Sequence, residues 1–225
     1  MSKKDVIIVG ARGLAKELLG YIEEHGGYRV TCILDENKLD DLFGYEVIHP
    51  DEYSGACKNA FLAVGYPEHK EFVIEKYRNL QLVWETFVHP TAVISKYVRL
   101  GTGSIIAPFV LLAGNAVLSD FVFMNVYSAV GHDSVVGTRC SLMPYSCVNG
   151  GVAIGKECLV ATGAKILPGV TMGDRCRISA GAIVSIDVPA DSLVFGNPAQ
   201  YQPDVAMLVK ARKRELTQES EGRTL

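Results

Sequence analysis

The sequence predicts two structural parts, a small Rossmann-like parallel α/β unit over residues 1–87 and a β-helix of hexapeptide repeats over residues 88–201. Three observations predict this fold. Short apolar runs alternate with helical patterns in the first part, and aliphatic residues recur at every sixth position in the second. The composition holds 22 Gly against 10 Tyr, 8 Phe and one Trp, and such a balance favours a repetitive architecture with a thin core.

The first part reads as strands alternating with helices. Apolar runs predict strands over residues 6–9, 30–34, 61–65 and 82–87. The spacing of apolar residues predicts helices over residues 15–25 and 67–78, and Pro67 stands in the first turn of the second helix, where proline is favoured. This alternation is typical of a parallel sheet covered by helices.

The carboxyl ends of these strands form the expected ligand edge, because open α/β sheets bind ligands there. Arg12 could contact a phosphate, and an acidic side chain could contact a ribose or a base. A dinucleotide fingerprint needs three glycines, and its positions hold Gly10, Arg12 and Ala15, which argues against NAD or FAD. The alternative is a tight turn followed by a solvated loop. The expected substrate-binding residues are Gly10, Arg12, Gly13, Asp35, Glu36, Gly65 and Tyr66.

The second part repeats with a period of six. Every sixth residue from Val88 to Val184 is aliphatic or Met, and the fifth residue of each hexad is small. The period fits neither a helix nor a simple strand, and it predicts triangular coils of three hexads each, with the aliphatic side chain inside. We expect the frequent glycine at the second hexad position to serve the turns by adopting positive φ.

The cysteines and the charge exclude several classes of protein. Cys140, Cys158 and Cys176 follow one another at intervals of three hexads, so we expect them to stack as small inward side chains rather than to bind a metal. Without a signal peptide or a CxxC pair, reduced thiols and a cytoplasmic location are expected. A net charge of -3 argues against a nucleic-acid partner. The uncharged stretch 100–119 contains Gly and Pro and continues the repeat, so we do not interpret it as a membrane span.

The hexad array and its closing segment, Val194-Phe195-Gly196-Asn197-Pro198-Ala199, resemble the left-handed β-helix of hexapeptide-repeat acyltransferases. With the α/β unit in front, the chain resembles the sugar acetyltransferases that act on bacterial nucleotide-linked amino sugars or on sialic acid. The resemblance implies acetyl-CoA as cosubstrate, a sugar nucleotide bound by the first part, and a homotrimer with active sites between subunits. Leu14 stands where the family's Gly-x-x-Gly-His loop has histidine. Residues 202–225 are expected to form a short helix and a tail.

The resemblance also implies a catalytic centre around His132. In this family an outward histidine followed by an acidic residue is the general base, and an asparagine seven residues earlier accompanies it. Asn125, His132 and Asp133 match that pattern. An amine that attacks a thioester must lose a proton, and imidazole can accept it near neutral pH. The family alignment selects Gly150 as the backbone N–H donor to the thioester oxygen. A lone outward histidine is otherwise most often a solvated residue.

Expected contacts to coenzyme A come from the coils after His132. Basic side chains in non-core positions there could meet its phosphates, or could merely keep the surface soluble. No metal is expected, because the array holds only His89 and His132, which lie on different coils and cannot form a three-histidine zinc site within one chain. The expected cofactor-binding residues are Gly150, Gly151, Lys156, Ala161, Lys165, Arg175 and Arg177.

The sequence therefore favours N-acetylation of a nucleotide-linked 4-amino-4,6-dideoxy sugar, a step suited to the synthesis of cell-surface polysaccharide. O-acetylation of sialic acid or another sugar is the alternative. A second alternative is a non-catalytic β-helix scaffold, which would have no need of Asn125, His132, Asp133 and Gly150 together. The identity of the sugar and of the nucleotide stays open at this point.

Overall fold

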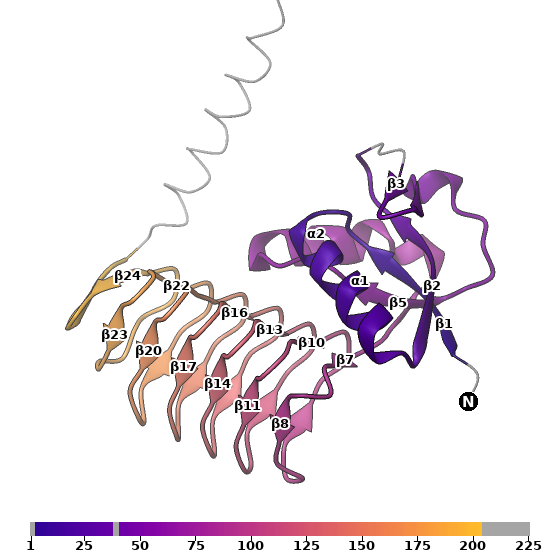
Figure 1. The fold of residues 1–225 in the computed structure, drawn as a ribbon. Helices are drawn as coiled ribbons and strands as arrows, with labels where there is room; N and C mark the ends of the chain where they lie inside the picture. The colour runs from indigo at the N-terminus through magenta and orange to yellow at the C-terminus, as the bar shows by residue number, and fades with distance from the viewer. Residues whose placement is uncertain (1–2, 38–40, 204–225) are drawn as a thin grey trace, which may run out of the picture.

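The computed structural model describes residues 3–37 and 41–203 and has the two-part architecture that the sequence predicts (Figure 1). An α/β unit at one end leads into a three-sided left-handed β-helix of stacked coils. The helix expected within residues 202–225 falls almost wholly outside the described residues.

A six-stranded sheet forms the centre of the α/β unit, in the order β3-β4-β2-β1-β5-β6. Every neighbouring pair is parallel except β3 and β4, which form an antiparallel hairpin at one edge. The sequence did not predict this hairpin, whose turn residues Phe43 and Gly44 have φ of 55° and 82°. The strands are β1 (Lys4–Val9), β2 (Tyr28–Leu34), β3 (Asp41–Leu42), β4 (Tyr45–Ile48), β5 (Asn59–Leu62) and β6 (Val83–Trp84).

The two predicted helices cover opposite faces of this sheet. Helix α1 (Gly13–His25) packs Leu18 and Ile22 on one face, and helix α2 (Pro67–Lys76) packs Val73 on the other. Residues of β1 alternate between the two faces, so the run Val6–Val9 is fully buried. Short 3-10 turns at Pro50–Glu52 and Arg78–Leu80 complete the unit.

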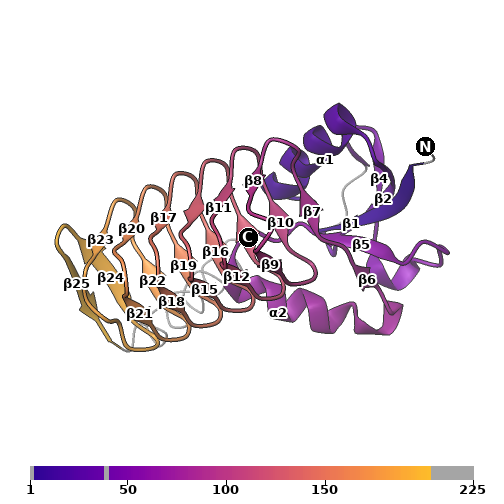
Figure 2. The same cartoon turned by 90° about the horizontal axis from the view of Figure 1, so that it is seen from below.

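The β-helix consists of three parallel sheets, which we call the first, second and third sheet (Figure 2). The first contains β7 (Phe87–Val88), β10 (Ile105–Ile106), β13 (Phe123–Met124), β16 (Ser141–Leu142), β19 (Leu159–Val160), β22 (Arg177–Ile178) and the closing hairpin β24 (Leu193–Gly196) and β25 (Ala199–Gln202). The second contains β8 (Val93–Ile94), β11 (Leu111–Leu112), β14 (Ala129–Val130), β17 (Cys147–Val148), β20 (Lys165–Ile166) and β23 (Ile183–Val184). The third contains β9 (Arg99–Leu100), β12 (Val117–Leu118), β15 (Val135–Val136), β18 (Ala153–Ile154) and β21 (Thr171–Met172).

The pairing register confirms the predicted coil of three hexads. Ile105 pairs with Phe123, and Leu111 pairs with Ala129. The small inward residues stack in the same register. Cys158 lies one coil after Cys140, and its N–H donates to Cys140 Sγ at 3.3 Å. All six cysteines are free thiols.

Three corners join the sheets, and their backbone corrects one prediction. We call the corner between the first and second sheets the first corner, that between the second and third the second corner, and that between the third and first the third corner. From Gly103 to Gly181 positive φ falls on the fourth residue of each hexad, such as Asp133 and Arg139, and not on the glycines at the second hexad position. Gly131 is instead required by close packing, since a Cβ there would lie 2.6 Å from the Gly150 nitrogen of the next coil.

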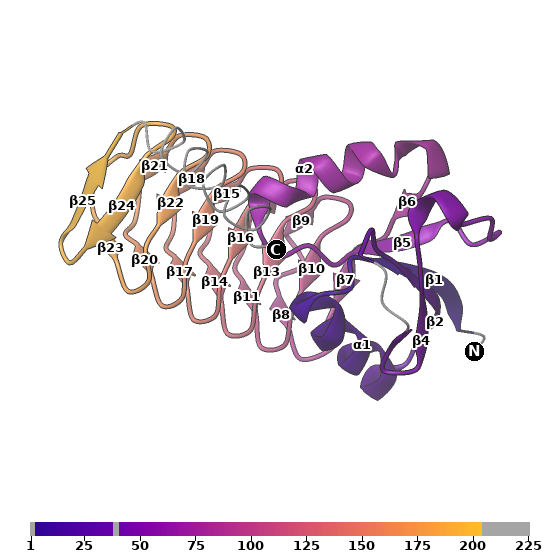
Figure 3. The same cartoon turned by 90° about the horizontal axis from the view of Figure 1, so that it is seen from above.

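Helix α2 lies along the third corner (Figure 3) and joins the α/β unit to the β-helix. Lys70 of α2 is buried, and its Nζ donates to Phe121 O at 2.9 Å, Cys140 O at 2.9 Å and Ser141 Oγ at 2.8 Å. Burial lowers the pKa of Lys70 to about 7. This side chain bridges the two parts of the molecule.

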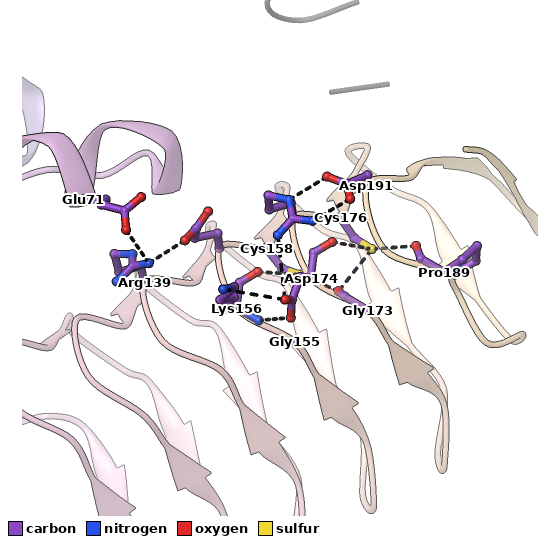
Figure 4. A network of polar contacts seen from close by, with 12 residues as sticks. Glu71, Arg139, Gly155, Lys156, Cys158, Gly173, Asp174, Cys176, Pro189 and Asp191 are labelled. Carbon is purple, nitrogen blue, oxygen red and sulfur yellow. Dashed lines mark hydrogen bonds and ion pairs between the residues drawn. The ribbon is translucent and has the colours of Figure 1, made fainter. Parts of the chain in front are cut away.

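Ion pairs flank Lys70 on both sides. Arg139 Nη2 lies 3.2 Å from Glu71 of α2 (Figure 4) and 2.5 Å from Glu157 of the next coil. Arg177 Nη2 lies 3.0 Å from Glu68 of α2. Helix α2 therefore covers part of the third corner, where Arg139 is paired with carboxylates from both parts of the molecule.

Candidate active site

His132 projects from the second corner, between β14 and β15. Its Nδ1 lies 2.8 Å from Asp133 Oδ2, and the imidazole is 72% exposed. Neighbouring residues on a regular strand would point to opposite sides. Asp133 has φ of 58°, and this left-handed turn brings its carboxylate beside the preceding side chain. A carboxylate can only accept, so in the neutral imidazole Nδ1 carries the proton and Nε2 is left as the acceptor.

A third side chain completes this arrangement. Asn115 Nδ2 donates to Asp133 Oδ1 at 3.0 Å. The hydrogen bond with His132, followed by that from Asn115, lowers the pKa of Asp133. Sequence reasoning missed Asn115, although its position one full coil before Asp133 could have revealed it.

Gly150 lies against the accepting nitrogen of His132. A Cβ at Gly150 would be 2.5 Å from His132 Nε2, so only glycine leaves room for the ring. The Gly151 N–H donates to His132 O at 2.8 Å, whereas the Gly150 N–H finds no acceptor among the residues that the structure describes. A proton acceptor therefore lies against the residue whose backbone N–H is available, and general-base attack on a carbonyl requires both groups.

Asn125 is not brought to this cluster within the chain. It follows β13 at the first corner, and its Oδ1 accepts from the Val126 N–H at 2.7 Å. Its role in the reaction stays a prediction.

The expected contacts to coenzyme A are distributed over several edges of the β-helix. Lys156 and Arg175 lie at the third corner, Arg177 on the first sheet, Lys165 on the second sheet and Ala161 at the first corner. Arg175 binds Asp191 through two nitrogens, both at 2.6 Å, and Lys156 Nζ lies 4.0 Å from Asp174 (Figure 4). With Arg177 paired to Glu68, three of the four basic side chains already have carboxylate partners. Their contact with phosphates stays a prediction.

A hollow of about 240 Å³ opens at the carboxyl ends of β1 and β2. Ala11, Arg12, Asp35 and Asn37 line it. Asp35 Oδ2 accepts from the Ala11 N–H at 2.8 Å, and Oδ1 accepts from the Asn37 N–H and Nδ2. Asp35 thus shapes the hollow with both oxygens already occupied by protein donors. Asn37 is a lining residue that the sequence analysis did not name.

Other residues predicted at this edge have varied roles. Gly10 has φ of 104°, and a Cβ there would lie 2.9 Å from Ala63 O, so the loop requires glycine. Glu36 forms an ion pair with Lys76. Tyr66 precedes α2 and is exposed, and Gly13 opens α1 next to Arg12.

Gly65 faces the β-helix. A Cβ at Gly65 would lie 3.8 Å from Phe123 of β13 and 4.0 Å from Leu14. Leu14, which stands at the family's histidine position, packs against the apolar cluster that joins α1 to the first coils.

Comparison with known proteins connects both parts of the chain to sugar acetyltransferases. The PglD N-terminal domain family matches residues 5–77. A GDP-perosamine N-acetyltransferase of Escherichia coli O157:H7 is 36% identical over 59 residues, which are 26% of this chain and 27% of the relative's own length. That alignment spans about a quarter of the curated relative.

Solved structures extend the likeness over most of the chain. PerB from Caulobacter crescentus, in complex with CoA and GDP-perosamine, superposes with a TM-score of 0.82 at 29% identity and covers 89% of this chain and 98% of that one. Over most of its length the chain is therefore similar to hexapeptide-repeat sugar acetyltransferases of known structure. The acetyltransferase domain of PglB from Neisseria gonorrhoeae, in complex with acetyl coenzyme A, gives a TM-score of 0.81 at 25% identity and covers 89% of this chain and all of that domain.

Two further findings concern residues 3–37 and 41–203. No group of three or more His, Cys, Asp or Glu side chains there is arranged to hold a metal ion. No helix there has the length and apolar character to cross a membrane.

Proposed function

We propose that this chain transfers the acetyl group of acetyl-CoA to the amino group of a nucleotide-linked 4-amino-4,6-dideoxy sugar. The observation that carries the proposal is the second corner, where Nε2 of an Asp133-bound His132 lies against Gly150, whose backbone N–H has no acceptor in the described chain. The structural relative that binds CoA and GDP-perosamine supports the same chemistry.

The reaction assigns one task to each group. The sugar nitrogen attacks the thioester carbon, and His132 Nε2 takes the proton that the amine loses. Asp133 holds the Nδ1 proton and favours the imidazolium that forms. The Gly150 N–H donates to the oxygen as it gains charge. The C–N bond forms, the C–S bond breaks, and the imidazolium returns its proton to the leaving thiolate.

The α/β unit supplies the nucleotide site in this proposal. Arg12 carries a guanidinium at the hollow, directly before the N-terminus of α1, where the helix dipole favours an anion such as a diphosphate. Residues 1–87 would thus bind the acceptor, and residues 88–201 the acetyl donor.

A homotrimer with shared active sites is part of the proposal. The α/β unit covers the first sheet and the third corner, whereas His132 lies at the opposite second corner. The second and third sheets expose apolar side chains, among them Val93, Leu111 and Val135, which suit burial against further copies of the chain. A sugar nucleotide held by one subunit would then meet His132 of a neighbour.

The location and the pathway belong to the same proposal. Six free thiols are typical of a reducing compartment and support a cytoplasmic location. An N-acetylated nucleotide sugar would serve the synthesis of cell-surface polysaccharide.

The test is release of the CoA thiol from acetyl-CoA with a panel of nucleotide-linked 4-amino sugars and with free sialic acid. We expect turnover with at least one amino-sugar nucleotide and an acetyl group that survives mild alkali, as an amide does. An alkali-labile product would favour O-acetylation. No thiol release with any acceptor would contradict the proposal and favour the scaffold.

A further inference from the structure

Asn115 occupies the second corner one coil before Asp133, and its amide binds the carboxylate oxygen that His132 does not use. We propose that Asn115 is a positioning residue, which orients Asp133 so that His132 keeps its proton on Nδ1 and presents Nε2 to the acceptor. The catalytic part of this inference rests on the proposed function.

The backbone places Asn115 and Asp133 directly above one another. They occupy the same corner position on successive coils, with φ of 62° and 58°. The Asp133 carboxylate is 58% exposed, so water competes for both of its oxygens. A donor fixed on the neighbouring coil holds Oδ1, and Oδ2 is thereby directed at His132 Nδ1.

The corner backbone alone does not call for asparagine. In the two coils after Asp133 the same corner position holds Gly151 and Gly169, with φ of 68° and 76°. Glycine therefore satisfies the left-handed turn without a side chain. The amide of Asn115 adds a hydrogen bond that the turn does not need.

The neutral amide also suits the chemistry. Asp133 helps His132 by its negative charge, which favours the imidazolium. A lysine or arginine at position 115 would hold the carboxylate and also offset that charge. Asn115 orients the carboxylate and leaves its charge available to the imidazole.

The first experiment reads the tautomer of His132 directly. Two-bond proton–nitrogen NMR of the full chain, with the His132 signals assigned by His132→Ala, distinguishes a proton on Nδ1 from one on Nε2. We expect neutral His132 to hold it on Nδ1 in the wild type. Asn115→Gly removes the amide without straining the turn and should give a mixture of the two tautomers. Asp133→Asn provides the reference in which the carboxylate is absent.

A matched control separates this effect from the loss of any corner side chain. Phe109 lies on the same coil as Asn115, with φ of 60° at the first corner, and it is also exposed. Phe109→Gly should leave the His132 tautomer unchanged. If Asn115→Gly leaves it unchanged as well, Asn115 does not position Asp133 and the inference is wrong.

Kinetics then connect the tautomer to turnover. Asn115→Gly should lower kcat about 3- to 10-fold, the loss expected for one ordinary hydrogen bond, with KM for acetyl-CoA unchanged. In an Asp133→Asn background the same change should have no further effect on kcat. Additive losses would contradict the inference. Because the tautomer is measured without substrate, a chain that acetylates nothing would refute the proposed function and still leave the positioning of His132 decided.

Discussion

The second and third corners of the β-helix share one backbone geometry and differ in how their side chains are satisfied. Asp133 and Arg139 occupy equivalent positions, with φ of 58° and 59°. Arg139 is 18% exposed and contacts two carboxylates, one of them from α2. His132, next to Asp133, is open to solvent and lies against Gly150, whose backbone N–H has no acceptor in the described chain.

The difference shows that the repeat determines where a side chain leaves the backbone, and the covering element determines its role. At the third corner Glu71 of α2 and Glu157 of the next coil pair with Arg139, and the corner joins the two parts. At the second corner the available groups are an acceptor nitrogen and a donor N–H, which a reacting amine and thioester would satisfy. Substitutions at the two corners should therefore affect different properties.

The largest effects are expected when His132 at the second corner and Arg139 at the third corner are each replaced by alanine. His132→Ala should lower turnover by about 10²- to 10⁴-fold, the usual range for a positioned base, and leave the melting temperature nearly unchanged because the side chain fills no core volume. Arg139→Ala should lower the melting temperature by several degrees, since it strands the largely buried Glu157, and leave the corner of His132 intact. Turnover assays and thermal melts on both variants check this. The reverse pattern would remove the distinction between the corners.

A smaller loss of turnover is expected for Gly150→Ala. The added Cβ would lie 2.5 Å from His132 Nε2, so the ring must move away from the donor N–H. We expect kcat to fall about 10- to 100-fold, within the range for a misplaced catalytic group. Gly114→Ala is the matched control at the same corner, because its Cβ would meet only Ser95 Oγ at 3.8 Å. Equal losses in the two variants would show that the proximity to Nε2 is irrelevant.

The α/β hollow extends the comparison to substrate binding. Arg12→Ala should raise KM for the sugar nucleotide about tenfold, the size of one lost charge-assisted contact, with KM for acetyl-CoA unchanged. Asp35→Ala should act in the same direction by releasing the Ala11 N–H. Steady-state kinetics with each substrate varied in turn measures both constants. A rise in KM for acetyl-CoA alone would reassign the hollow to the donor.

The smallest effect is a pH dependence of stability at the third corner. The pKa of Lys70 falls from 10.5 to about 7 on burial. Between these values the unfolded chain binds more protons at this site than the folded one, so Lys70 makes the free energy of unfolding rise by up to about 1.4 kcal/mol per pH unit. Chemical unfolding of the wild type and Lys70→Met from pH 7 to 9 should show a difference that grows in favour of the wild type. A constant difference would mean that the three acceptors keep Lys70 charged.

The sequence predicted the β-helix well because its period reports the stacking of coils directly. The register of the coils and the cysteine stack follow from that period alone. The same regularity gave an incorrect role to the glycines, since close approach between coils cannot be distinguished from positive φ in a sequence pattern. Gly131 shows this, because it is required by the neighbouring coil.

The contacts between the two parts could not be predicted. Lys70 lies in a polar helical pattern and would normally be interpreted as a solvated charge, yet the packing of α2 on the third corner buries it completely. Arg177 has a carboxylate partner in Glu68 for the same reason. These contacts depend on how two separately patterned units meet, and no local pattern in either unit records that.

The most direct test of the account is the pH profile of kcat for the wild type and His132→Ala. If His132 is the base, wild-type turnover falls as pH decreases, because a protonated imidazole cannot accept the proton of the amine. The residual turnover of the variant should then lack that decrease. An acidic limb that persists unchanged in His132→Ala would belong to the substrate amine and would contradict the assignment of the second corner as the catalytic centre.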